Sequence, residues 1–414
     1  MPEGFNRKFL FILFVFSNIA YAFVFYFTGE LGGDFKGRGY SVELISMLIS
    51  LAMVLFTFWF LAVFSWNLVS RIKVNRALPE VGLENWFFDF VFLLLAIYLV
   101  IYRGLFGGGV GGHVPENGGV IFHYVAALIT PSWLVAIYLF YRAQAPSVLY
   151  YVVLLLYVVS GLLSGLTGSL VLIFYLYLTK LTLSGSSFSK VKIMVFFLIG
   201  VFVYPLFRIF KVVVIEANRK GGLSEVDVAD LGSFSVFLEK GWVSAYFDTL
   251  EASFQRLQMV ANQYFIIDNL AIIRDLFFIY DGKLFFENVW IYSVFVKRLG
   301  IYEIGEYSFQ NILALAATGN GTWSSQSGFL GHILLNPFSG FFYLLISIIF
   351  MVLLSLLAKL YDKSKYLLNY VWFLVLSYFV HGWYFATVEV LQAFIVFGGI
   401  VSCFGLKATL NRRR

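Results

Sequence analysis

The residues of this chain that are best suited to chemistry include four cations grouped around the end of one apolar run. Arg208 and Lys211 close the run YPLFRIFK, and Arg219 and Arg256 follow in the mostly polar stretch beyond it. Guanidinium groups form paired hydrogen bonds with phosphate oxygens, so we expect these four side chains to bind a pyrophosphate. The alternative is that Arg208 and Lys211 only extend toward lipid headgroups.

A histidine, His332, is the candidate general base. It ends the sequence SGFLGH, 327–332, whose glycines allow another chain or a ligand to approach closely. A histidine that titrates near neutrality can accept a proton from a sugar hydroxyl. The alternative is a histidine with a purely structural hydrogen bond. His381 and Glu389 flank a short turn near the C-terminus, and we expect them to pair with each other in a structural or a catalytic role.

Composition places these residues in a membrane protein. Hydrophobic residues make up 61% of the chain, charged residues only 13%, and the mean hydropathy is +0.86. Soluble proteins carry about twice that charged fraction, and apolar runs of about 20 residues are typical of membrane spans. Because backbone groups in lipid must bond within their own segment, we expect helices and not strands.

The remaining titratable residues exclude several kinds of site. Cys403 is the only cysteine and lies in an apolar run, so neither a disulfide framework nor a cysteine-based metal site is expected. The four histidines are scattered, with no pair at metal-ligand spacing. We therefore expect no bound metal and no cofactor. Membrane topology accounts for most of the net charge of +6, so nucleic-acid binding is not expected.

Hydropathy predicts an all-α, polytopic fold with ten membrane spans. Pro131 predicts a kink in the fourth span, and the small residues SGLLSGLTGS at 160–169 predict a tight turn between the fifth and sixth. Residues 1–213 then hold spans one to seven, 214–327 form a large extramembrane segment, and 328–414 hold spans eight to ten. The predicted spans are 9–27, 43–64, 86–105, 119–141, two short helices within 147–181, 191–213, 330–357, 367–383 and 386–406.

The distribution of charge predicts the orientation of these spans. Sixteen of the 29 Lys and Arg residues, but only five of the 23 acidic residues, lie near every second connection. The positive-inside rule places these connections and both termini in the cytoplasm. The segment 214–327 then lies on the opposite side. A multi-pass protein of a bacterial inner membrane is the simplest setting.

The extramembrane segment is expected to be ordered. Apolar residues recur at spacings of three and four over 242–275, which predicts an amphipathic helix that lies along the membrane surface or covers the bundle. The stretch 308–327 is rich in Ser, Asn, Gln, Gly and Thr. It is expected to form a loop packed over a site.

Two motifs carry a resemblance to a known family. The turn at 160–169 joins two short spans, and SGFLGHILLNPFSGFF, 327–342, leads back into the membrane with Asn336, Phe338 and Gly340. This arrangement resembles Wzy-type O-antigen polymerases, the oligosaccharide-repeat-unit polymerases of bacterial inner membranes. Family members often carry Thr-Gly-Ser-Arg in the turn, whereas here Thr167-Gly168-Ser169 is followed by Leu170.

The resemblance implies a membrane glycosyltransferase of the GT-C class. Such an enzyme transfers a glycan from undecaprenyl pyrophosphate to a sugar hydroxyl of another lipid-linked repeat unit. Arg208, Lys211 and Arg256 would stabilise the departing pyrophosphate, and His332 would accept the hydroxyl proton. No metal is required if arginines supply the charge. The implied partners are the lipid-linked oligosaccharide, the bilayer and a chain-length regulator.

Two other functions fit the same sequence. An O-antigen ligase shares the architecture and the donor but transfers the glycan to lipid A core. A flippase for polysaccharide or lipid-linked oligosaccharide is the non-enzymatic alternative. Flippases usually have two similar halves and cavity-lining charges in several spans. This chain has no obvious internal repeat and concentrates its charge in one segment, which favours an enzyme.

Overall fold

The computed structural model is mostly helical. It describes residues 4–35, 38–39, 41–74, 78, 81–82, 85–106, 120–164, 168–184, 195, 198, 200–203, 205–206, 241–255, 257–283, 287, 299–300, 307–321, 325 and 327–411. In the part of the chain that the structure describes, the strands are β1 (Glu30–Leu31) and β2 (Arg38–Gly39). They form a short antiparallel pair in which Glu30 lies opposite Gly39. The 3₁₀ helix η1 (Gly33–Phe35) lies between the two strands in the chain.

Long apolar helices make this chain a multi-pass membrane protein. Within the described residues, five helices are long and apolar enough to cross a membrane, and a bent pair raises the number to six. The pair, α5 and α6, bends by 44° at Pro131, where the sequence predicted a kink. The spans are α1 (Phe5–Thr28), α2 with η2 and α3 (Leu44–Val69), α4 (Trp86–Phe106), α5 (Val120–Ile129) with α6 (Pro131–Arg142), α17 (Pro337–Tyr361) and α19 (Tyr384–Asn411).

Shorter apolar helices account for part of the difference from ten spans. The predicted pair within 147–181 is present as α7 (Val148–Leu163) and α8 (Gly168–Leu183). The predicted span 367–383 is α18 (Tyr366–Leu374), which continues into the π-helix η8 (Val375–Phe379). The predicted span 191–213 lies largely outside the described residues. Ten spans therefore remain a prediction.

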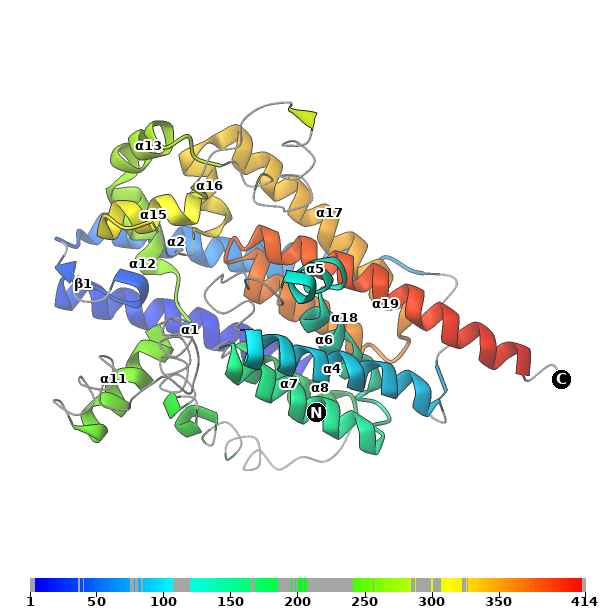
Figure 1. The fold of residues 1–414 in the computed structure, drawn as a ribbon. Helices are drawn as coiled ribbons and strands as arrows, with labels where there is room; N and C mark the ends of the chain where they lie inside the picture. The colour runs from blue at the N-terminus through cyan, green and yellow to red at the C-terminus, as the bar shows by residue number, and fades with distance from the viewer. Residues whose placement is uncertain are drawn as a thin grey trace.

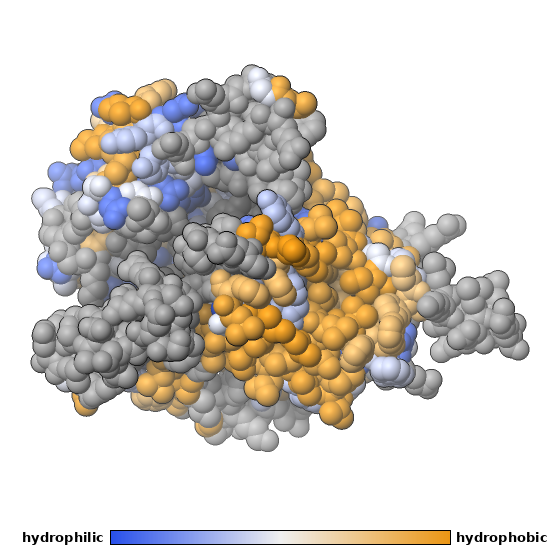
Figure 2. Space-filling model, viewed as in Figure 1, coloured by the Kyte–Doolittle hydropathy of each residue, from blue (hydrophilic) through white to orange (hydrophobic). Residues whose placement is uncertain are grey.

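The bundle has two distinct ends (Figure 1). At the basal end, Asn6 near the start of α1 donates hydrogen bonds to Thr179 and Asn369. At the distal end, α12 (Val260–Asp268), α13 (Leu270–Ile279), α15 (Phe309–Thr318) and α16 (Gly328–Leu335) lie together. Figure 2 shows an apolar band over the bundle and hydrophilic residues over the distal end. This contrast is typical of a membrane-embedded bundle with a polar domain on one side.

The segment predicted as one surface helix over 242–275 is three helices, α11 (Trp242–Gln255), α12 and α13. Every residue of α12 from Val260 to Ile266 is buried, and α12 packs against α1 and α2. Of the two predicted positions, along the membrane surface or covering the bundle, this burial excludes the first for α12. Its polar residues are buried because they have hydrogen-bond partners inside the protein, an arrangement that spacing alone does not distinguish from an exposed polar face.

Two further boundaries differ from the sequence prediction. The predicted loop 308–327 contains α15, which begins with a capping box in which the side chains of Ser308 and Asn311 satisfy each other's backbone N–H groups. The predicted span 330–357 is divided at Asn336, whose side chain accepts a hydrogen bond from Ser339 N and so starts α17. Pro337 favours the first position of a helix, so the break is encoded locally.

Candidate functional site

His332 lies on α16 at the distal end of the bundle, outside the candidate membrane spans. Its side chain is buried, and a hydrogen bond of 3.2 Å joins its Nε2 to the Ser327 hydroxyl. The ring stacks on Tyr343 at 5.0 Å between centroids and meets the edge of Phe309 at 4.9 Å. Two aromatic walls and one serine therefore fix the imidazole in place.

Glycines allow α12 to approach His332 closely. Gly328 has a φ of +62°, and a Cβ there would lie 2.8 Å from Gln263 Nε2. A Cβ at Gly331 would lie 2.9 Å from Ile266 Cδ1. The absence of both side chains lets Gln263 Nε2 donate a 2.6 Å hydrogen bond to the Ser327 carbonyl. The close approach predicted for these glycines is confirmed.

Buried carboxamides hold the segments around the site together. Asn262 Nδ2 donates to Ser325 Oγ at 2.8 Å, and Ser325 N donates to the Gln310 carbonyl at 3.1 Å. Gln310 Nε2 in turn donates to the Gly382 carbonyl at 3.2 Å. We call Asn262, Gln263 and Gln310 the carboxamide layer. It joins α12, α15 and the turn before α19, and Gln263 links it to Ser327, the hydrogen-bond partner of His332.

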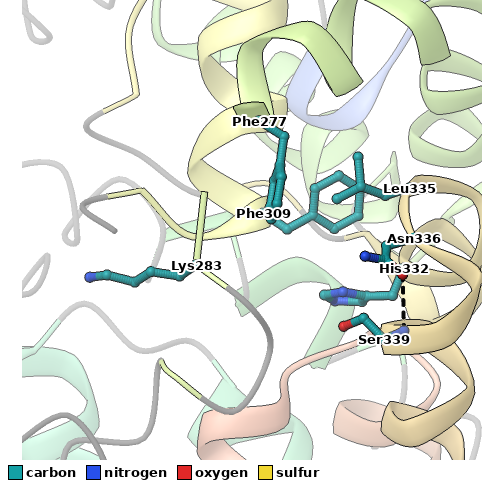
Figure 3. Close-up of a pocket in the computed structure, with 7 residues that line it drawn as sticks. All are labelled: Phe277, Lys283, Phe309, His332, Leu335, Asn336 and Ser339. Carbon is teal, nitrogen blue, oxygen red and sulfur yellow. Dashed lines mark hydrogen bonds between the residues drawn. The ribbon is translucent and has the colours of Figure 1, made fainter. Parts of the chain in front are cut away.

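His332 also lines a pocket (Figure 3). The pocket is a shallow depression, because its volume of about 220 Å³ includes open solvent. The imidazole ring points into it, whereas the Lys283 side chain extends away from the other side chains. Phe277, Phe309 and Leu335 lie together on one side of the pocket, and the polar side chains of Asn336, His332 and Ser339 lie on the other. Its lining residues are Phe277, Lys283, Phe309, His332, Leu335, Asn336 and Ser339.

Burial lowers the pKa of His332 from its usual 6.5 to about 4. The imidazole is therefore neutral at physiological pH, with one ring nitrogen protonated and the other free to accept a proton. Chemically, the site offers a proton acceptor, a serine hydroxyl and apolar walls that reduce the amount of water around them.

The four cations proposed to bind pyrophosphate lie outside the described residues. Pyrophosphate binding therefore remains a prediction for Arg208, Lys211, Arg219 and Arg256. Of the residues predicted for catalysis or binding, His332 is the one that the structure places.

His381 and Glu389 have separate partners, so the expected pairing between them is replaced by two different contacts. His381 Nδ1 lies 3.1 Å from the Leu376 carbonyl, and its ring meets the edge of Phe14 at 5.6 Å. Glu389 accepts a 2.9 Å hydrogen bond from Trp133 Nε1. The His381 hydrogen bond lies within the segment that follows α18, whereas its ring contact with Phe14 and the bond of Glu389 to Trp133 join different helices. These contacts favour a structural role for the two residues.

Sequence reasoning missed the residues that surround His332. Ser327 belongs to the motif that contains His332, but its hydrogen bond to the imidazole cannot be read from the sequence. The carboxamide layer comes from segments far apart in the chain, and a single sequence carries no signal that joins them. Arg103, buried in the last turn of α4, was also missed. An arginine at the end of an apolar run was a visible signal, but the same pattern occurs when the side chain extends to lipid headgroups.

Comparison with known proteins leaves the chain without a recognised relative. No protein-family model, no curated protein sequence and no solved structure matches it. The function must therefore be argued from the residues and their geometry.

Proposed function

We propose that this protein is a membrane glycosyltransferase that polymerises lipid-linked oligosaccharide repeat units, with His332 as the general base. The observation that carries the proposal is a buried, neutral imidazole that faces a pocket at the polar end of a multi-pass bundle. The motif 327–342, which resembles that of O-antigen polymerases, builds α16 and the start of α17, two of the elements that form the pocket.

The proposed reaction needs one proton acceptor and one stabilised leaving group. A sugar hydroxyl of the acceptor forms a bond to the anomeric carbon of the donor glycan. The bond from that carbon to the pyrophosphate oxygen breaks, and its electron pair remains on the pyrophosphate. The hydroxyl proton passes to His332. Arg208, Lys211, Arg219 and Arg256 are proposed to stabilise the pyrophosphate.

Substrate binding would strengthen His332 as a base. A pKa of about 4 makes the imidazole a weak proton acceptor in the empty site. A pyrophosphate bound nearby carries negative charge, which favours the protonated imidazole and raises its pKa. The donor substrate therefore prepares the base at the moment when it is needed.

The aromatic side chains support a sugar substrate. Phe277 and Phe309 line the pocket beside His332, and flat apolar rings pack well on the faces of sugars. Asn336 and Ser339 line the same pocket and supply polar groups for hydroxyls. We place this end on the periplasmic side of a bacterial inner membrane, as the charge distribution of the sequence predicts.

Chain elongation by the purified protein tests the proposal. The full-length protein in lipid is given a defined undecaprenyl-pyrophosphate-linked repeat unit, and product length is read on a gel. We expect wild type to form a ladder and His332→Ala to lose about 100-fold or more in rate, the usual effect of removing a general base. Cys403→Ser, at an exposed residue of α19, is the control and should elongate normally.

The result that would contradict the proposal is a wild-type protein that forms no ladder. Transfer to added lipid A core without elongation would identify a ligase. Movement of the lipid-linked unit across the bilayer without any new bond would identify a flippase. A His332→Ala variant that elongates at the wild-type rate would remove His332 from the reaction.

A further inference from the structure

Arg103 is a buried cation that the proposed transferase reaction does not use. It lies in the last turn of α4 and is 9% exposed. Its Nη1 donates to Ser160 Oγ at 3.2 Å, and its Nη2 donates to Ser132 Oγ at 2.6 Å. Within the described part of the chain, no carboxylate forms an ion pair with Arg103. Both hydrogen-bond partners are therefore neutral.

A buried guanidinium without an anion is costly, because neutral hydroxyls replace only part of its hydration. Intramembrane charges that lack a partner are therefore candidates for ligand binding. Arg142 on α6 shows the contrasting arrangement, with its Nε 2.9 Å from Asp89 Oδ1. Glu389 accepts a hydrogen bond from the indole N–H of Trp133, the residue after Ser132. It does not form an ion pair with Arg103.

Arg103 contacts a broken membrane span. The chain changes direction at Thr130, which has a φ of +46°, and α5 and α6 meet there at 44°. Ser132, which accepts from Arg103, is the second residue of α6. The guanidinium therefore lies beside the start of a twelve-residue helix, where the helix dipole also favours negative charge. Two independent features attract an anion to the same place.

The surface around this bend is apolar and exposed. No described residue of α5 is buried, and Ile121, Tyr124 and Leu128 are each more than 60% exposed. Leu105, two residues after Arg103, is 77% exposed. Such side chains are stable in a membrane only when acyl chains surround them. A ligand that reaches Arg103 past α5 therefore comes from the bilayer.

We propose that Arg103, with Ser132 and Ser160, binds the phosphate group of a membrane lipid. The guanidinium has five N–H groups in a fork that matches phosphate oxygens, and two of its nitrogens now contact only serine hydroxyls. A lipid phosphate supplies the missing negative charge. The inference does not depend on the transferase activity. If that activity is confirmed, this site would hold the second lipid-linked substrate.

Lipid binding by the full-length protein tests this site. The protein in detergent is titrated separately with undecaprenyl pyrophosphate, phosphatidylglycerol and uncharged undecaprenol, and bound lipid is counted by native mass spectrometry. We expect a phosphate-bearing lipid to bind and undecaprenol not to bind. Arg103→Gln should weaken that binding roughly 10- to 100-fold, the effect of losing a hydrogen bond to a charged group. Whichever phosphate lipid binds more tightly identifies the source of the ligand.

Arg71→Gln, at an exposed arginine after α3, is the matched control and should bind lipid as wild type does. Ser160→Asp provides a second test, because it places a carboxylate beside the guanidinium. It should raise the thermal midpoint of the protein and remove the same share of phosphate-lipid binding that Arg103→Gln removes. Binding that is unchanged in both Arg103→Gln and Ser160→Asp would overturn the proposal.

Discussion

The two ends of the bundle use buried polar groups in different ways. At the basal end, Arg142 donates to both carboxylate oxygens of Asp89 and to the carbonyls of Val81 and Gly82. Ser147 adds a 2.6 Å hydrogen bond to Asp89. This cation and this anion neutralise each other within the protein. They hold α4, α6 and the start of α7 in fixed positions.

The distal end leaves polar groups without full compensation. Gln263 Oε1 is buried and has no hydrogen-bond partner among the described residues. His332 faces a pocket, and Arg103 contacts neutral hydroxyls. Buried atoms without a hydrogen-bond partner among the described residues also occur at the basal end, where Asn6 Oδ1 and Arg7 Nε are examples. The difference between the two ends therefore lies in their buried cations, because Arg142 has an anionic partner whereas Arg103 contacts hydroxyls. We infer that the basal ion pair stabilises the fold, and we propose that His332 and Arg103 bind substrates.

The largest effect should come from removing one partner of the basal ion pair. Asp89→Ala leaves the buried Arg142 guanidinium without its anion, and we expect a loss of about 3–5 kcal/mol of unfolding free energy. Unfolding in mixed micelles, followed by far-UV circular dichroism, measures it. Arg103→Gln is the matched comparison and should destabilise the protein much less. Equal losses of unfolding free energy in Asp89→Ala and Arg103→Gln would contradict the proposed difference between the two buried cations.

Arg208 extends the comparison to the cations predicted from sequence. Arg208→Ala should insert normally and slow elongation about 100- to 1,000-fold, or about 2.7–4 kcal/mol of barrier, as for loss of an oxyanion donor. Arg208→Lys should recover only part of the rate, because an ammonium cannot form the paired hydrogen bonds. A normal polymer ladder from Arg208→Ala at wild-type protein level would exclude Arg208 from the site.

A smaller effect is expected from the packing of α16 on α17. A Cβ at Gly340 would lie 2.4 Å from the backbone Cα of Ile333, so Gly340→Ala must push the two helices apart. We expect about 1–3 kcal/mol of destabilisation, together with slower elongation because His332 is displaced. Gly399→Ala, where a Cβ meets nothing within 4 Å, is the control. Identical thermal midpoints for both variants would show that the contact is unimportant.

Hydropathy predicted the helical membrane fold and the bend at Pro131, because both follow from local composition. It failed for 242–275, where spacings of three and four fit an exposed amphipathic helix as well as the buried α12. The difference lies in tertiary hydrogen bonds such as that from Gln263 to Ser327. The break at Asn336 was encoded by a local cap, but the apolar residues on both sides hid it.

The candidate site was predictable only in part. His332 stood out because a titratable residue between glycines is rare in apolar sequence. The role of Ser327 depends on its 3.2 Å contact with His332, which sequence does not show. Arg103 was overlooked because its burial depends on Ser132 and Ser160 from two other helices.

The pH dependence of elongation tests the central claim, that His332 accepts the proton of the attacking hydroxyl. Burial lowers the pKa of His332 to about 4, and we propose that bound pyrophosphate raises it. The imidazole can accept a proton above its pKa and is protonated below it. We expect the elongation rate of the wild-type protein to fall as the pH decreases toward the pKa of His332. The residual rate of His332→Ala should not fall in the same way. An identical acid limb in both proteins would contradict the claim.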